Sequence, residues 1–185
     1  MTVVWHVDDL EVSHVYSFEI TKFACYLDNI YCGLSVKRGK VYNYLGVDLY
    51  FSIVWKVQVS MIHYLNNILR DFPEYLVTVS ASPADDHLFK VRSKEEARLL
   101  PEEQALLFHL VVEQILFIGS RYRRGIQTAV DFLTTSVKQP DKDDWGKLKR
   151  VMRFLKVTRG LKLNLSIDYI PVFKWLVDAS YDTHE

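Results

Sequence analysis

The sequence lacks net charge, cysteine pairs and long apolar runs. Lys plus Arg and Asp plus Glu each number 23 in 185 residues, so net charge does not indicate a nucleic-acid or membrane partner. The two cysteines, Cys25 and Cys32, can form neither a disulfide framework nor a zinc site, and we expect reduced thiols. No apolar run approaches the ~18 residues of a membrane span, and no targeting segment opens the sequence. We therefore expect a cytoplasmic or nuclear protein with no membrane partner.

The sequence also lacks the motifs of several kinds of catalytic site. The seven glycines include no glycine-rich phosphate loop, and the six histidines have no metal-ligand spacing. Nothing in the sequence orders a Ser-His-Asp triad. What is present is a composition with 49% hydrophobic and 14% aromatic residues, which is typical of a packed protein of about one domain.

The zero net charge conceals a strong asymmetry along the chain. The stretch 71–113 holds nine acids and four bases, whereas the stretch 145–165 holds seven bases and no acid. Arg121, Arg123 and Arg124 add a further basic cluster. The sequence thus has an acidic middle zone and a basic C-terminal part.

Hydrophobic periodicity predicts an α+β fold. Short apolar strands flank Asp8-Asp9, and alternation over 45–51 and 57–59 predicts a β-hairpin. Strand-like runs at 161–165 and 172–177 close the chain. Helical spacing, with start and stop signals at Pro73, Pro101, Pro140 and Asp141–Asp144, predicts helices over 20–31, 62–72, 101–118, 126–137 and 145–155.

Asp8 and Asp9 are the first candidate for chemistry. Side chains alternate faces along a strand, so two adjacent carboxylates reach one metal ion only where the backbone turns. A turn between two apolar strands would supply that arrangement, and paired carboxylates of this kind hold Mg²⁺ for phosphoryl transfer. The alternative is an ordinary turn, because aspartate is common in turns for its own backbone chemistry.

Several motifs together resemble the reverse transcriptase of copia-type LTR retrotransposons. They occur in the order and spacing of that family and cover nearly the whole chain. The motifs are the Asp-Asp box Trp5–Leu10, the strand Tyr44–Leu49, the strand-to-helix element Val59–Leu65, the helix-rich block Phe108–Thr158, and the closing strand Lys174–Ser180, which resembles the first strand of a retroelement RNase H domain.

The resemblance implies a partial polymerase with three parts. Residues 1–60 would be a palm remnant carrying the Asp-Asp box, 61–160 a helical thumb and connection, and 161–185 a truncated start of an RNase H-like domain. Asp8, Asp9 and Asp178 would be metal-binding catalytic carboxylates for Mg²⁺. The implied activity is RNA-directed DNA synthesis on an RNA or DNA template-primer. The missing parts of the polyprotein are candidate partners.

The sequence also departs from the family pattern. His6 replaces the tyrosine of the Asp-Asp box, and Val157 stands where a glycine with positive φ is expected. The family's third carboxylate lies well upstream of the box, whereas seven residues precede Asp8 here. We therefore expect this chain alone to bind Mg²⁺ weakly and to be inactive. We also expect the isolated RNase H strands to be poorly held, because they would have no sheet to join.

The basic C-terminal helix is the second candidate site. Trp145, Leu148 and Leu155 predict a packed face opposite the bases, and a solvated amphipathic face would explain this pattern without any ligand. The alternative is sequence-independent binding of nucleic-acid phosphates. The Arg121 cluster would be the second contact, or simply a cation cluster at a helix C-terminus. A third hypothesis is a genomic relic with no selected role. The candidate phosphate contacts are Arg121, Arg123, Arg124, Lys147, Lys149, Arg150, Arg153 and Lys156.

Overall fold

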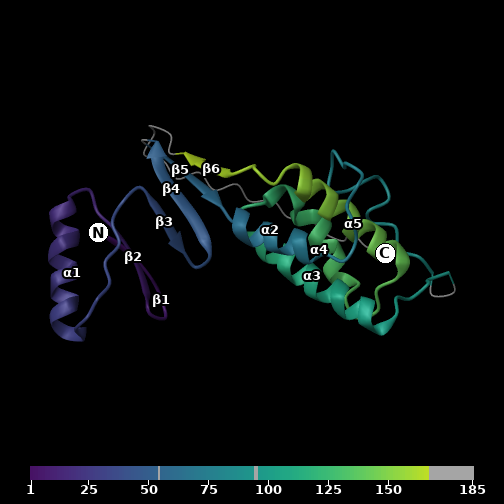
Figure 1. The fold of residues 1–185 in the computed structure, drawn as a ribbon, viewed down its shortest axis with the longest axis horizontal. Coiled ribbons are helices and arrows are strands. Elements are labelled where there is room, and N and C mark those ends of the chain that lie inside the picture. The colour runs from purple at the N-terminus through teal and green to yellow at the C-terminus, as the bar shows by residue number, and fades with distance from the viewer. Residues whose placement is uncertain (54, 94–95, 167–185) are drawn as a thin grey trace, which may run out of the picture.

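The computed structural model describes residues 1–53, 55–93 and 96–166, which form three parts along the long axis of the molecule (Figure 1). An N-terminal hairpin with one helix lies at one end, a four-stranded sheet lies in the middle, and a helical unit lies at the other end. Helices and strands are both present in quantity, so the fold is α+β, as predicted. Asp178 and the predicted strand 172–177 lie outside the described residues.

The N-terminal unit is a hairpin followed by a helix. Strands β1 (Thr2–His6) and β2 (Asp9–Ser13) pair antiparallel with His6 opposite Asp9, and α1 spans Ser17–Tyr31. This confirms the predicted strands around Asp8-Asp9 and the predicted helix. No described side chain before Val59 is buried, although many in this unit are apolar. The hydrophobic core therefore lies in the rest of the chain.

The central sheet has the strand order β3-β4-β5-β6, and all its pairs are antiparallel. The predicted hairpin over 45–59 is confirmed as β4 and β5, with a register shift between Tyr50 and Ile53. The bounds are Val41–Tyr44 for β3, Val47–Ile53 for β4, Lys56–Ser60 for β5 and Leu163–Ser166 for β6.

Strand β6 corrects one expectation. We expected the closing strands to have no sheet to join, but β6 pairs with β5, with Leu163 opposite Val59. The Gln58 amide also donates to Asn164 Oδ1 at 2.9 Å. The pairing spans more than 100 residues of sequence, which periodicity within either strand cannot reveal. Residues 163–166 therefore belong to the central sheet.

The helical unit contains nearly all of the core. The predicted helix boundaries lie within a few residues of the observed ones. Pro73 follows the first helix of this unit, Pro101 precedes the second, and Asp141 caps the last. The last helix ends without a residue of positive φ, since Thr158 has φ −97°, so the expected strain at Val157 is wrong. The bounds are Ile62–Asp71 for α2, Glu102–Arg121 for α3, Arg124–Ile126 for the 3₁₀ turn η1, Gln127–Thr135 for α4 and Lys142–Val157 for α5.

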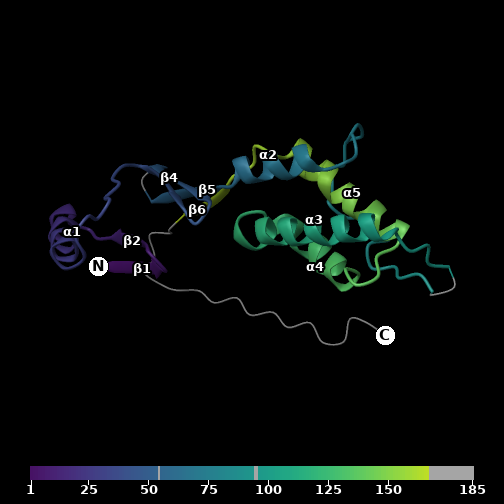
Figure 2. The same cartoon turned by 60° about the horizontal axis from the view of Figure 1, so that its bottom comes forward.

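Helix α3 is the centre of this packing. Phe108, Val112 and Ile115 are fully buried on it, and α3 contacts α2, α4 and α5. Among the described helices, α3 is also the one long and apolar enough to cross a membrane by length and composition alone. Figure 2 shows α3 beside α2, α4 and α5, and the buried side chains of α3 belong to the hydrophobic core.

Residues 72–92, which we call the strap, begin the connection from α2 to α3. The strap contains no helix or strand and passes over α5. Four of its side chains are buried: Phe72, Leu76, Ser80 and Leu88. The Phe72 ring stacks on the Trp145 ring of α5 at a centroid distance of 5.6 Å. A long connection without secondary structure is uncommon inside a compact unit.

Candidate functional site

Asp8 and Asp9 lie at the tip of the N-terminal hairpin. The two-residue turn is Val7-Asp8, and Asp9 is the first residue of β2. Val7 has φ 53°, a conformation that a β-branched residue rarely adopts and that glycine usually supplies at this position of a hairpin turn. The Trp5 indole N–H donates to the Val7 carbonyl at 2.6 Å and supports the turn. Both carboxylates are exposed, so an ion in solution can reach them.

The donor set at this tip suits a hard cation but is small. Carboxylate oxygens are the ligands that Mg²⁺ prefers. Among the described residues, however, no group of three or more His, Cys, Asp or Glu side chains comes together to hold a metal. Two exposed carboxylates on one turn would keep most of the ion's water shell, which predicts weak and loosely oriented binding.

Helix α5 packs its apolar face into the core, as the sequence predicts. Asp141 caps the helix, because its carboxylate accepts from the backbone N–H groups of Asp143 and Asp144. The Asp144 carboxylate in turn accepts from the Asp141 N–H, which completes a capping box. Burial raises the pKa of Asp144, and the charge of Asp141 adds to this rise, while the Asp141 N–H and Lys147 lower it. Trp145, Leu148 and Leu155 are buried.

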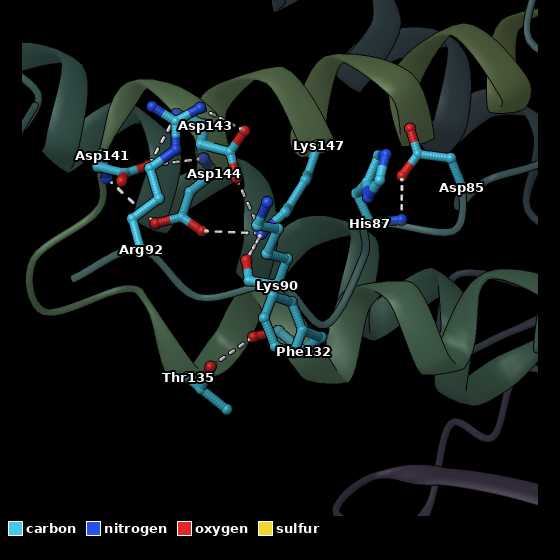
Figure 3. Close-up of polar contacts among 10 residues, drawn as sticks. All are labelled: Asp85, His87, Lys90, Arg92, Phe132, Thr135, Asp141, Asp143, Asp144 and Lys147. Carbon is cyan, nitrogen blue, oxygen red and sulfur yellow. Dashed lines mark hydrogen bonds and ion pairs between the residues drawn. The ribbon is translucent and has the colours of Figure 1, made fainter. Parts of the chain in front are cut away.

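Lys147, the first of the five candidate phosphate contacts on α5, points inward. Lys147 Nζ lies 3.1 Å from an Asp143 carboxylate oxygen and donates to the Lys90 carbonyl at 2.8 Å (Figure 3). It also lies 4.8 Å from the centroid of the Phe132 ring. The Lys147 side chain is only 11% exposed, so it holds the strap and α4 against α5 and does not face solvent.

The next basic residues of α5 contact carboxylates of the strap. Lys149 Nζ lies 3.2 Å from Glu74 Oε2, and Arg150 Nη1 lies 3.2 Å from Asp85 Oδ2. Glu74 also accepts from the Trp145 indole at 2.5 Å. Burial alone would raise the pKa of Glu74, but the hydrogen bonds from Trp145 and Lys149 and the charges of Lys149 and Arg153 together hold it below its usual value.

The C-terminal bases of α5 are also engaged with the strap. Lys156 Nζ donates to the Leu76 carbonyl at 2.8 Å and lies over the Tyr75 ring. The Nε atoms of Arg150 and Arg153 are buried and have no hydrogen-bond acceptor in the part of the chain that the structure describes. The strap therefore touches or faces all five α5 bases that the sequence assigns to phosphate contacts.

The arginine cluster after α3 divides into two kinds of side chain. Arg123 is only 7% exposed, and its guanidinium donates to the Thr158 carbonyl at 2.8 Å and to the Thr158 hydroxyl. A longer bond at 3.4 Å reaches the Leu161 carbonyl. Burial lowers the pKa of Arg123, but the group stays charged. Arg121 and Arg124 are exposed, and Arg121 stacks over the Phe117 ring at 3.7 Å.

A cavity of about 680 Å³ lies beside the N-terminus of α5, between residues 90–92 and α4. Its charged walls include Arg92, Asp143 and Lys147, which already bond to one another (Figure 3). The Arg92 guanidinium lies 3.2 Å from Asp143. The charged groups beside the N-terminus of α5 are thus already paired within the cavity wall.

Sequence reasoning missed the contact between the strap and α5, and it missed the buried position of Arg123. The signal for the strap is the complementary charge of the stretches 71–113 and 145–165, which the composition shows without showing the partners. No signal marks Arg123, because its neighbours Arg121 and Arg124 have the same residue type and remain exposed.

Comparison with known protein families, curated proteins and solved structures finds no match to this chain. The likeness to copia-type reverse transcriptases therefore stays a prediction that rests on the motifs of the sequence.

Proposed function

We propose that the chain is a piece of a reverse-transcriptase-like nucleotidyltransferase whose metal-binding carboxylates are Asp8 and Asp9. The observation that carries the proposal is the hairpin tip, where both carboxylates follow a turn with a positive φ at Val7. Strained backbone of this kind is costly and persists most often at functional sites. The exposed tip and the oxygen-only donor set support a divalent cation. When bound, Mg²⁺ would supply Lewis-acid stabilisation of a transferring phosphoryl group.

We expect the chain to bind divalent cations at this tip with a dissociation constant of about 1 mM or weaker, because two carboxylates make a small ligand set. Paramagnetic Mn²⁺, used as a stand-in for Mg²⁺, should selectively broaden the NMR signals of residues 6–10. Asp9→Asn should abolish the broadening, whereas Glu19→Gln, a matched loss of one acid on α1, should leave it unchanged.

The same reasoning predicts no primer extension by the chain alone in Mg²⁺. Extension that Asp8→Asn abolishes would contradict the expected inactivity and would mean that other groups complete the metal site. Equal Mn²⁺ broadening in Asp9→Asn and in the unmodified chain would overturn the proposed role of the tip.

A second candidate function, sequence-independent nucleic-acid binding, rests on the cations that no carboxylate neutralises. Arg121, Arg124 and Arg159 are exposed and lie near no acid in the described part of the chain. The bonds of Arg123 to Thr158 and Leu161 hold the end of α3 beside the segment that follows α5. These cations therefore share one end of the helical unit, as contacts to a phosphate backbone require.

Reversing Arg121 and Arg124 to glutamate should weaken binding of single-stranded RNA and reduce the salt dependence. Each lost phosphate contact should lower the slope of log K against log salt by about 0.7, hence about 1.4 for both. Fluorescence anisotropy over a salt series measures this slope. Lys138→Glu with Lys142→Glu is the matched control at the other end of α5 and should change the slope less. A wild-type affinity that does not vary with salt would count against this function.

A further inference from the structure

The acidic and basic stretches of the sequence contact each other in the folded chain. The strap supplies Glu74 and Asp85, and α5 supplies Lys149 and Arg150, so an acidic segment lies against a basic one. The contacts run along α5 from Lys147 to Lys156. The same cations that would contact a phosphate backbone are thus already in contact with the strap.

The ion pairs between the strap carboxylates and α5 are weak. The side chains of Glu74 and Asp85 are 40% and 43% exposed, and ion pairs of that exposure contribute about 0–1 kcal/mol each. The segment has no backbone ladder of helix or strand to hold it. Glu74 lies between the buried Phe72 and Leu76, and Asp85 lies between the buried Ser80 and Leu88, so each carboxylate can move while the anchors on both sides stay packed.

The pairing also leaves donors unused. The Nε atoms of Arg150 and Arg153 are buried without a described acceptor, although Arg150 already contacts Asp85 through Nη1. A buried donor without an acceptor is unfavourable, and a planar guanidinium can bind an oxyanion through two N–H groups at once. A phosphate that replaced the carboxylate could take up donors that the strap leaves free.

We propose that the strap is an intramolecular competitor, in which Glu74 and Asp85 occupy the cations of α5 and hold the chain in a state of low affinity for polyanions. A phosphate backbone that displaces these two carboxylates gains Lys149 and Arg150 as contacts. The inference rests on the second candidate function, nucleic-acid binding, and adds how that binding is regulated. RNA bound at the Arg121 end contacts α5 as well when the strap carboxylates are displaced.

The test removes the two strap charges and keeps their hydrogen-bonding oxygens. In Glu74→Gln with Asp85→Asn, the amide oxygens can still accept from the Trp145 indole and from the His87 N–H. With two cations freed and a slope of about 0.7 per contact, we expect the salt slope for single-stranded RNA to steepen by about 1.4. The affinity at 0.1 M salt should rise roughly 10- to 25-fold.

Two further variants make the test specific. Asp86→Asn with Glu96→Gln removes the same total charge from acids that contact no α5 cation in the described residues, and it should leave the slope unchanged. Adding Lys149→Gln and Arg150→Gln to the strap variant should cancel its gain. Inorganic polyphosphate serves as a second probe that reports on α5 independently of nucleic acid.

The outcomes separate the two hypotheses. Equal RNA binding by the wild type and the strap variant would overturn the strap inference and leave nucleic-acid binding standing. No RNA binding by any variant, together with tighter polyphosphate binding by the strap variant, would support the strap inference and overturn nucleic-acid binding. A chain that binds neither polyanion in any variant would overturn both.

Discussion

Replacing Arg123 with methionine is expected to lower the free energy of unfolding by about 2–3 kcal/mol. The guanidinium is almost fully buried and bonds to the carbonyls of Thr158 and Leu161. Methionine fills part of the same volume but donates no hydrogen bond, so these acceptors lose their buried partner. Urea denaturation followed by circular dichroism measures the change.

The neighbouring Arg124→Met is the matched control, because Arg124 is exposed and should change the free energy of unfolding by less than about 0.5 kcal/mol. These two variants also test the role that the sequence predicts for Arg123, a contact to phosphate. If Arg123 contacts RNA, its replacement would reduce the salt slope of RNA binding by about 0.7 without a loss of stability. That result would contradict the structural role described here.

Local features of the fold could be predicted from the sequence because their causes are local. Asp141 begins α5 since an aspartate there can accept from the next backbone N–H groups, and the structure contains that capping box. The β4–β5 hairpin follows from strict alternation on both sides of a short break. The turn at Asp8 follows in the same way from apolar residues on both sides.

Long-range contacts could not be predicted, because their causes lie in partners distant along the chain. The four residues of β6 pair with β5, which lies about 100 residues earlier in the chain, and nothing in 163–166 indicates which strand they pair with. The amphipathic pattern of α5 predicts which face is polar but not what covers it. The candidate site was therefore predicted as a set of basic residues, whereas the structure adds that the strap already contacts most of them.

The N-terminal unit and the helical unit also differ in what stabilises them. Burial of large apolar side chains is the main source of folding free energy, and among the described residues the fully buried ones begin at Val59. In the N-terminal unit, Trp5 is 74% exposed and no described side chain is buried. The hairpin that carries Asp8 and Asp9 therefore depends on its own backbone pairing. We expect this hairpin to unfold locally while the helical unit stays folded.

This difference predicts how a core mutation will act. Phe108→Ala should destabilise the helical unit by about 3–5 kcal/mol, because Phe108 is fully buried on α3 and its removal leaves a cavity in the core. Leu110→Ala, two residues further on the same helix, should cost much less because Leu110 is 52% exposed. Denaturant unfolding measures both changes.

Hydrogen exchange then distinguishes one cooperative unit from two. Exchange in α3 and α5 should accelerate in Phe108→Ala in proportion to the lost stability, while exchange in α1 should stay as in the wild type, because α1 contributes no buried side chain to the core. Equal acceleration in α1 and α3 would contradict this division and would tie the Asp8-Asp9 tip to the stability of the helices. Independent exchange would instead mean that the proposed metal tip and the proposed nucleic-acid face fold separately, so a loss of one activity by mutation need not affect the other.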